Sequence, residues 1–137
     1  MDSFKSLFVK YMSEHDIKFT DLDDRAVKLS FSSKVVPNGV TVFAIFDKEN
    51  HNGVHLVATN FVIVPEDKFA AVLMACNESN AKFRWVKFYV NDKLNVCAEA
   101  DAIIDAESGG REVTELAFRI SDIVDDAFPA FMKAVYS

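Results

Sequence analysis

The sequence predicts an α+β domain, and three patterns in its 137 residues support this prediction. Apolar residues recur at helical spacing in three segments, alternating apolar and polar residues lie between these segments, and turn residues separate the alternating runs. Half of the residues are hydrophobic and 13 are Phe, which supplies enough apolar surface for one core. Because no stretch rich in Pro, Gly or Ser divides the chain, residues 1–137 are expected to fold as a single domain.

Charge and apolar content limit the classes of partner. Acidic residues outnumber Lys and Arg by 21 to 15, so nucleic acid is not an expected partner. No window is as long and apolar as a membrane span, and no N-terminal segment resembles a signal peptide, so we expect no membrane partner and a cytoplasmic location. Cys76 and Cys97 are then reduced thiols, and no motif spacing predicts a metal or a cofactor.

The N-terminal half predicts a helix and three strands. The helix is expected from Asp2 to His15, because five apolar residues share one side of it: Phe4, Leu7, Phe8, Tyr11 and Met12. A connection with a short extended piece follows over residues 17–24. Turn residues, among them Pro37-Asn38-Gly39, then separate three alternating runs that we expect to form an antiparallel meander. These strands are predicted at residues 27–31, 40–47 and 54–64.

Two further helices are predicted on either side of a β-hairpin. Pro65 suits the first turn of the second helix, which is expected to end between Asn77 and Asn80. Its buried stripe is predicted to contain Phe69, Val72, Leu73 and Cys76. Gly109-Gly110 is interpreted as a flexible turn before the last helix, since neither glycine belongs to a complete phosphate-binding motif. Pro129 is expected to bend this last helix without ending it.

The hairpin spans Phe83 to Ile104, and its register follows from the apolar residues. A three-residue loop, Asn91-Asp92-Lys93, places one apolar set inward, whereas a two-residue loop would mix polarity on both faces. In this register Val90 lies opposite Leu94, and Lys87 lies opposite Cys97. The inward set is Val86, Phe88, Val90, Leu94, Val96 and Ala98. The outward set, which we define as the candidate partner surface, is Phe83, Trp85, Lys87, Tyr89, Cys97 and Glu99.

This outward set has two interpretations. It is either a solvated sheet face stabilised by cross-strand pairs or a surface that binds a protein partner, with Trp85 as its main anchor. Other chemistry is less favoured. His51 and His55 flank a turn but lack the carboxylates that support a metal site, and Cys97 has no histidine near it in the sequence that could activate its thiol.

The segment from Pro65 to Ile104, PEDKFAAVLMACNESNAKFRWVKFYVNDKLNVCAEADAII, resembles the YbjN-type family of bacterial proteins, also called bacterial sensory transduction regulators. The shared features are a helix with an Asn-rich end, two strands around an acidic turn, and a closing helix. The resemblance covers Val64 to about Met132, and the preceding elements fit more loosely. It implies a fold similar to type III secretion chaperones, often dimeric, and a role that is not enzymatic. It supplies no catalytic residue.

The first functional hypothesis is therefore a non-catalytic, chaperone-like or regulatory module that binds a protein segment, with a homodimer left open. The alternative is a small-molecule-binding protein or a thiol-dependent enzyme, with a pocket between helix and sheet and Cys97 or a His as the reactive group. A third hypothesis, single-stranded RNA stacked on Phe83, Trp85 and Tyr89, is opposed by the net charge of -6.

Overall fold

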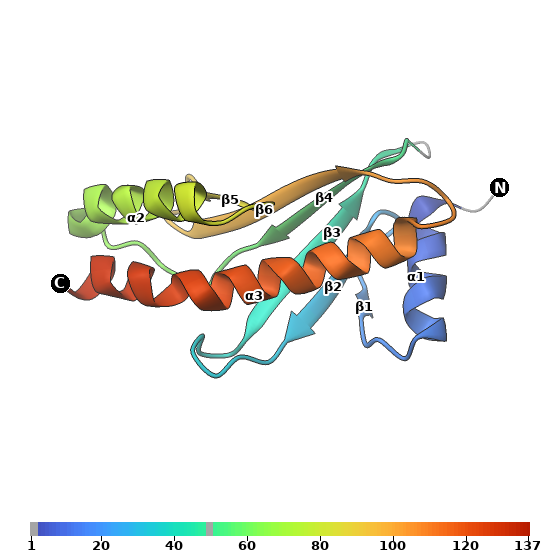
Figure 1. The fold of residues 1–137 in the computed structure, drawn as a ribbon, viewed down its shortest axis with the longest axis horizontal. Helices are drawn as coiled ribbons and strands as arrows, with labels where there is room; N and C mark the ends of the chain where they lie inside the picture. The colour runs from blue at the N-terminus through green and yellow to red at the C-terminus, as the bar shows by residue number, and fades with distance from the viewer. Residues whose placement is uncertain (1–2, 49–50) are drawn as a thin grey trace.

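The computed structural model describes residues 3–48 and 51–137, and within these ranges the chain forms an α+β fold (Figure 1). The helices are α1 (Phe4–Glu14), α2 (Phe69–Lys82) and α3 (Gly109–Tyr136). The strands are β1 (Thr20–Asp21), β2 (Ala26–Phe31), β3 (Val40–Phe46), β4 (Gly53–Ala58), β5 (Lys87–Val90) and β6 (Val96–Ile103). All six belong to one antiparallel sheet in the order β1-β2-β3-β4-β6-β5. No helix in the described ranges could cross a membrane.

The predicted order of elements is confirmed, and one sheet joins the meander to the hairpin. The short extended piece expected after the first helix is β1, at the edge of the sheet. Rows of buried side chains cross the strands: Val27 lies opposite Ala44, which lies opposite Leu56, and Leu56 lies opposite Ala100. Alternation along each strand therefore gives the sheet one continuous apolar face.

The third predicted strand is shorter than expected. We predicted a run to Val64, but β4 ends at Ala58. The extended conformation is interrupted at Asn60, whose φ of 64° is in the left-handed region. After this break Val62 accepts a hydrogen bond from the Val96 N–H at 3.0 Å, and the Val64 N–H donates to Leu94 at 2.8 Å. The chain thus resumes its pairing with the hairpin past the break.

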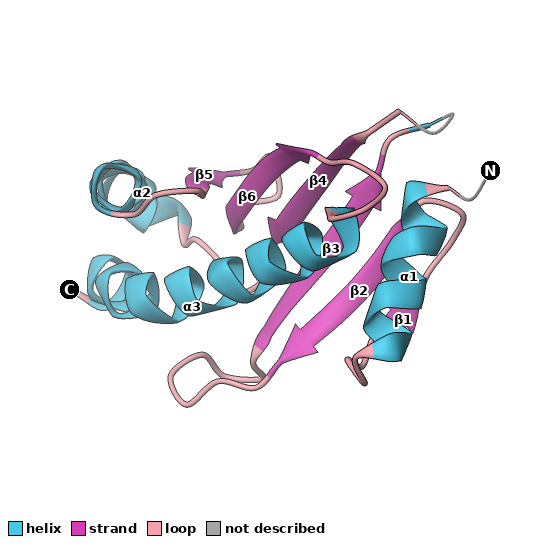
Figure 2. Cartoon of the chain, turned by 45° about the vertical axis from the view of Figure 1, so that its right-hand side comes forward, coloured by secondary structure: helices cyan, strands magenta, loops and turns pink. Residues whose placement is uncertain are grey.

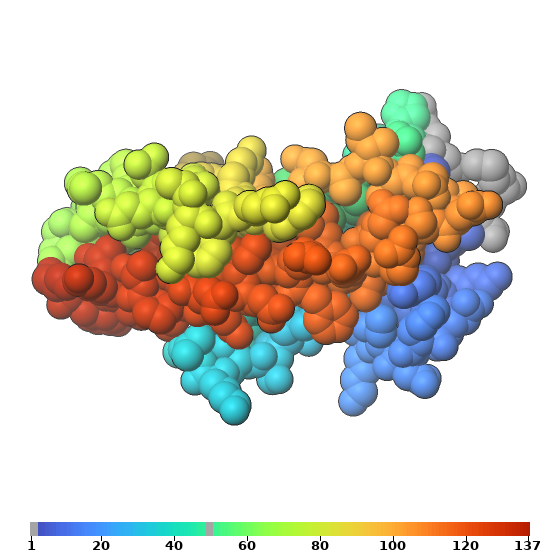
Figure 3. Space-filling model, in the orientation of Figure 1, coloured from blue at the N-terminus to red at the C-terminus, as the bar shows by residue number. Residues whose placement is uncertain are grey.

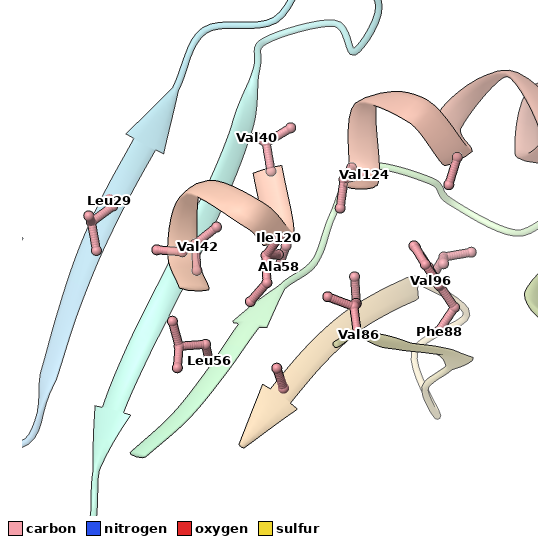
Figure 4. Close-up of a cluster of buried hydrophobic side chains, with 14 of the residues drawn as sticks. Leu29, Val40, Val42, Leu56, Ala58, Val86, Phe88, Val96, Ile120 and Val124 are labelled. Carbon is pink, nitrogen blue, oxygen red and sulfur yellow. The ribbon is translucent and has the colours of Figure 1, made fainter. Parts of the chain in front are cut away.

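Helix α3 lies along the apolar face of the sheet and packs against α1 near its start and α2 near its end (Figure 2). Figure 4 shows Ile120 and Val124 of α3 among buried side chains from β3, β4 and β6. The helix continues through Pro129, as predicted, while the expected bend there stays a prediction. The predicted flexible turn at Gly109-Gly110 is wrong, because both residues belong to the first turn of α3.

Gly110 instead allows α1 and α3 to approach closely. A Cβ atom at this position would lie 2.6 Å from the Cβ of Tyr11, far inside normal contact distance. The absence of a side chain at Gly110 is therefore a packing requirement.

Candidate functional site

The hairpin has a five-residue loop, two residues longer than predicted. Val90 lies opposite Val96 instead of Leu94. The side-chain oxygen of Asn91 accepts hydrogen bonds from the N–H groups of Lys93 and Asn95, both at 3.0 Å, and Leu94 takes a φ of 59°. The predicted pairing is therefore wrong by two residues. Because side chains alternate with a period of two, this shift leaves the predicted inward set on the same face.

Four of the six candidate residues share the face of the sheet opposite the helices. Lys87 lies opposite Glu99 and Tyr89 lies opposite Cys97, so the predicted pair of Lys87 with Cys97 is wrong. Cys97 is also only 3% exposed, because Thr59 and Asn91 cover its Sγ at 3.4 and 3.5 Å. The expected accessible thiol is therefore not present on this face.

Phe83 and Trp85 lie on the helix side of the sheet, apart from the other four. Phe83 is partly buried at the end of α2, and its ring centre lies 6.5 Å from that of Phe88. Trp85 has a φ of 77°, which is rare for a bulky residue and breaks the strand alternation. Its indole is 59% exposed, with the guanidinium carbons of Arg84 and Arg119 at 5.1 and 5.7 Å from the ring centre.

Glu99 holds together a group of polar side chains on the open face of the sheet. Its carboxylate accepts a hydrogen bond from the Tyr89 hydroxyl at 2.9 Å and pairs with the Lys87 ammonium at 3.0 Å. His55 has Nε2 3.4 Å from the same carboxylate and Nδ1 2.8 Å from Asp101. We call these five residues the Glu99 cluster. Neither they nor other acidic, His and Cys residues in the described ranges form a group suited to holding a metal.

Two members of the Glu99 cluster, Tyr89 and Lys87, have raised pKa values. Burial, followed by the hydrogen bond with Glu99, raises the pKa of Tyr89 above its usual value of 10.0. The hydrogen bond and negative charge of Glu99 likewise raise the pKa of Lys87 above 10.5. Tyr89 is therefore neutral and Lys87 charged at pH 7, which suits an ion-pair network better than proton transfer.

An apolar surface on α2 was not recognised from the sequence. Phe69 and Leu73 were expected in the buried stripe, but each is 41% exposed, and Met74 is 65% exposed. The sequence signal is the run FAAVLMAC, which is apolar on every side of the helix, whereas α3 and β5 together bury only the side that carries Val72, Ala75 and Cys76. Figure 3 shows α2 beside α3 on the helix-bearing face. We call Phe69, Leu73 and Met74 the α2 patch.

Comparison with known structures supports the chaperone-like fold. YbjN from E. coli superposes with a TM-score of 0.66 and 14% identity, covering 93% of each chain. A chain of the heterodimeric ExoU–SpcU complex from the type III secretion system of Pseudomonas aeruginosa gives 0.60 and 15%, covering 88% of this chain and 94% of that one.

The HopA1–SchA chaperone–effector complex also contains a similar chain. The TM-score is 0.51 and the identity is 10%, with 85% of this chain and 89% of that one covered. No curated protein matches the sequence. The YbjN family profile, whose description names bacterial sensory transduction regulators, matches residues 8–133. Since this match spans nearly the whole sequence, the chain belongs to the YbjN family.

Proposed function

We propose that the chain is a non-catalytic, chaperone-like or regulatory module of the bacterial cytoplasm that acts by binding protein. The observation that carries this proposal is the α2 patch, an apolar surface on a helix that is covered on only one side. Exposed apolar patches of this kind are typical of protein interaction sites. The solved complexes of similar fold, described as heterodimeric and chaperone–effector, agree with this role.

A second copy of the chain is the partner that fits the α2 patch best. Glu66 and Asp67 lie at the N-terminal end of α2, where the Lys68 ammonium is taken up by a hydrogen bond to the Ser137 carbonyl, and Lys82 and Arg84 lie at its C-terminal end. Two α2 helices packed antiparallel around a twofold axis would bring each acidic end next to a basic end while they bury both apolar patches. The proposed assembly is therefore a homodimer through α2.

The open face of the sheet is the second part of the proposal. Lys87, Tyr89 and Glu99 of the candidate partner surface remain together there, beside the half-buried side chains of Phe43 and Val57. A protein segment that covers these two apolar residues would lie beside the Lys87 ammonium and the Glu99 carboxylate. Substitution of Lys87 by Glu is expected to weaken the binding of such a segment, while binding at the α2 patch should stay unchanged.

Neither cysteine thiol supports the thiol-dependent alternative. Cys97 is covered, and burial raises the pKa of Cys76 to about 11, which disfavours the thiolate.

Photo-crosslinking tests the role of the α2 patch. A photoreactive amino acid at position 74 should crosslink to protein in living cells, with a product at twice the 15.4 kDa chain mass if the partner is a second copy. The matched control is position 22, where Leu22 is exposed on the opposite side of the fold from α2, next to β1. Equal crosslinking at the two positions would refute the proposed surface.

Solution mass tests the dimer directly. Met74→Asp should convert a dimer to a monomer, whereas Leu22→Asp should leave the mass unchanged. A wild-type protein that stays monomeric at about 100 μM, where weak homodimers with micromolar Kd are mostly associated, would exclude the homodimer.

A further inference from the structure

One edge of β6 has unpaired backbone groups. β6 extends to Ile103, whereas β5 covers it only as far as Glu99 (Figure 2). Phe88 of β5 directs its N–H and C=O away from β6, to the side chain of Asn80. Because these directions alternate along a strand, Lys87 and Tyr89 direct their N–H and C=O groups to Glu99 and Cys97 of β6. By the same alternation, Asp101 and Ile103 direct their N–H and C=O groups toward the uncovered edge. Neither has a hydrogen-bond partner on that side among residues 3–48 and 51–137.

A groove with an apolar floor lies on the helix side of this edge. Its volume is about 300 Å³, and Trp85, Ala100, Ala102 and Leu116 supply its apolar walls. The left-handed φ of Trp85 turns the chain out of the strand just before β5, which leaves the edge uncovered. The groove can accept an apolar side chain that projects from a strand placed next to β6.

The charges around the edge favour a basic segment. Asp101 projects to the open side of the sheet, with Glu99 two residues before it. Glu112 and Glu115 of α3 line the groove on the helix side, where Arg119 pairs with Glu115. Among the residues that line the groove, Asp101, Glu112 and Glu115 are acidic and Arg119 is basic, so acidic side chains outnumber basic ones there. Arg84 beside Trp85 and Lys87, which pairs with Glu99, lie next to the groove.

We propose that the free edge of β6 binds an extended, basic protein segment as an added strand antiparallel to β6. Alternate residues of the segment place apolar side chains in the Trp85 groove and basic side chains beside Asp101. Its N–H and C=O groups bond to those of Asp101 and Ile103. This site is separate from the α2 patch, so either proposal can fail without the other.

Trp85 provides the readout, because it is the only Trp in the chain. The probe is the acetylated and amidated peptide Lys-Val-Lys-Val-Lys-Val-Lys. Titration with this peptide should change the Trp85 fluorescence until the signal saturates. The fitted Kd should be about 1 mM or below, as expected for a short strand with few contacts. The peptide with Glu in place of Lys should bind at least about tenfold more weakly, because its side chains would meet the like charges of Asp101 and Glu99 on the open side.

Backbone methylation of the peptide tests the pairing itself. In an antiparallel added strand, the residues with basic side chains face the open side and direct their N–H groups to β6, as Lys87 does in β5. N-methylation of the Lys residues should therefore abolish binding, and N-methylation of the Val residues should leave it nearly unchanged. Amide hydrogen exchange at Asp101 and Ile103 should slow at least about tenfold with the unmodified peptide.

Protein variants complete the test. Asp101→Lys should weaken binding of the basic peptide, and Met74→Asp in the α2 patch should leave it unchanged. The proposal is overturned if the basic peptide gives no saturable signal, if the two methylated peptides bind alike, if the acidic peptide binds as well as the basic one, or if exchange at the β6 edge is unaffected.

Discussion

The side-chain amide of Asn80 takes the place of a neighbouring strand for Phe88. Its oxygen accepts the Phe88 N–H at 2.6 Å, and its nitrogen donates to the Phe88 carbonyl at 3.0 Å. These are the groups that an edge strand would otherwise expose to another chain. Helix α2 therefore closes the outer edge of β5, and the free edge of β6 is the part of this side that it leaves open.

Asn80→Ala should destabilise the fold by about 1–3 kcal/mol, because both partly buried backbone groups of Phe88 lose their partner. Urea denaturation measures the change. Asn77→Ala is the matched control, since Asn77 lies exposed one turn earlier in α2 and should change the free energy of unfolding by less than about 0.5 kcal/mol. Equal effects of the two substitutions would contradict the role of Asn80 at the edge.

Tyr89 and Glu99 of the Glu99 cluster should be coupled in their effects on the free energy of unfolding. Tyr89→Phe removes the hydrogen bond between them and should cost about 0.5–1 kcal/mol, given the partial exposure of the ring. In a double-mutant cycle, Glu99→Gln should reduce the effect of Tyr89→Phe, because the charged acceptor is lost. Strictly additive free energies of unfolding would show that this hydrogen bond contributes nothing to stability.

Stability should fall at alkaline pH because of the same cluster. The pKa values of Tyr89 and Lys87 are raised in the folded state, so the folded protein holds these protons more tightly than the unfolded chain does. Their contribution is present below the unfolded pKa values of 10.0 and 10.5, and it is lost as the pH rises through the folded values.

Thermal unfolding between pH 9 and 11 measures this loss of stability. The Tyr89→Phe variant, which has no phenol to ionise, should lose less stability over this range than the wild type. An identical pH dependence in the two proteins would mean that ionisation of Tyr89 does not contribute to the loss of stability.

Both thiols should react slowly with iodoacetamide in the folded protein. Burial, and then the neighbouring Cys97, raises the pKa of Cys76 from 9.0 to about 11, and Cys97 is itself covered. At pH 8 alkylation should be at least about tenfold slower than for a model thiol, because it requires local opening. Both should react at the rate of the model thiol in urea. Rapid alkylation of Cys97 in the folded state would revive the thiol-enzyme hypothesis.

Gly110→Ala should destabilise the junction of α1 and α3. The added methyl group would meet the Cβ of Tyr11, which is fixed to the backbone of α1 and cannot rotate away. We expect overpacking to cost about 1–3 kcal/mol, partly offset by up to about 1 kcal/mol of improved helix propensity. Urea denaturation that shows a net gain in stability would mean that α1 shifts freely.

The sequence alone predicted the elements and the core of the fold well, because alternation and helical spacing report burial directly. Val86, Phe88, Val96 and Ala98 are buried as predicted, even though the predicted pairing was shifted by two residues. A shift of two preserves the side-chain faces, so the pattern that identified the core could not also fix the pairing.

The candidate surface was harder to predict, because it depends on backbone conformations that side-chain patterns do not encode. Positive φ angles at Trp85 and Leu94 are unusual for these residue types, and they moved Trp85 to the helix side and lengthened the loop. Cys97 lies on the predicted face but is covered by Thr59, which follows β4 and is distant in sequence. The α2 patch was visible as an apolar run, but its exposed side depends on tertiary packing.

The position of α3 in the chain has a consequence during protein synthesis. α3 follows every strand in sequence, yet it covers the apolar face to which β3, β4 and β6 contribute. At about 5–20 residues per second, its 28 residues take roughly 1–6 s to translate. Until α3 has left the ribosome and packed, the strands have no helix to cover their shared apolar face, so we expect newly made chains to be most open to aggregation before α3 emerges.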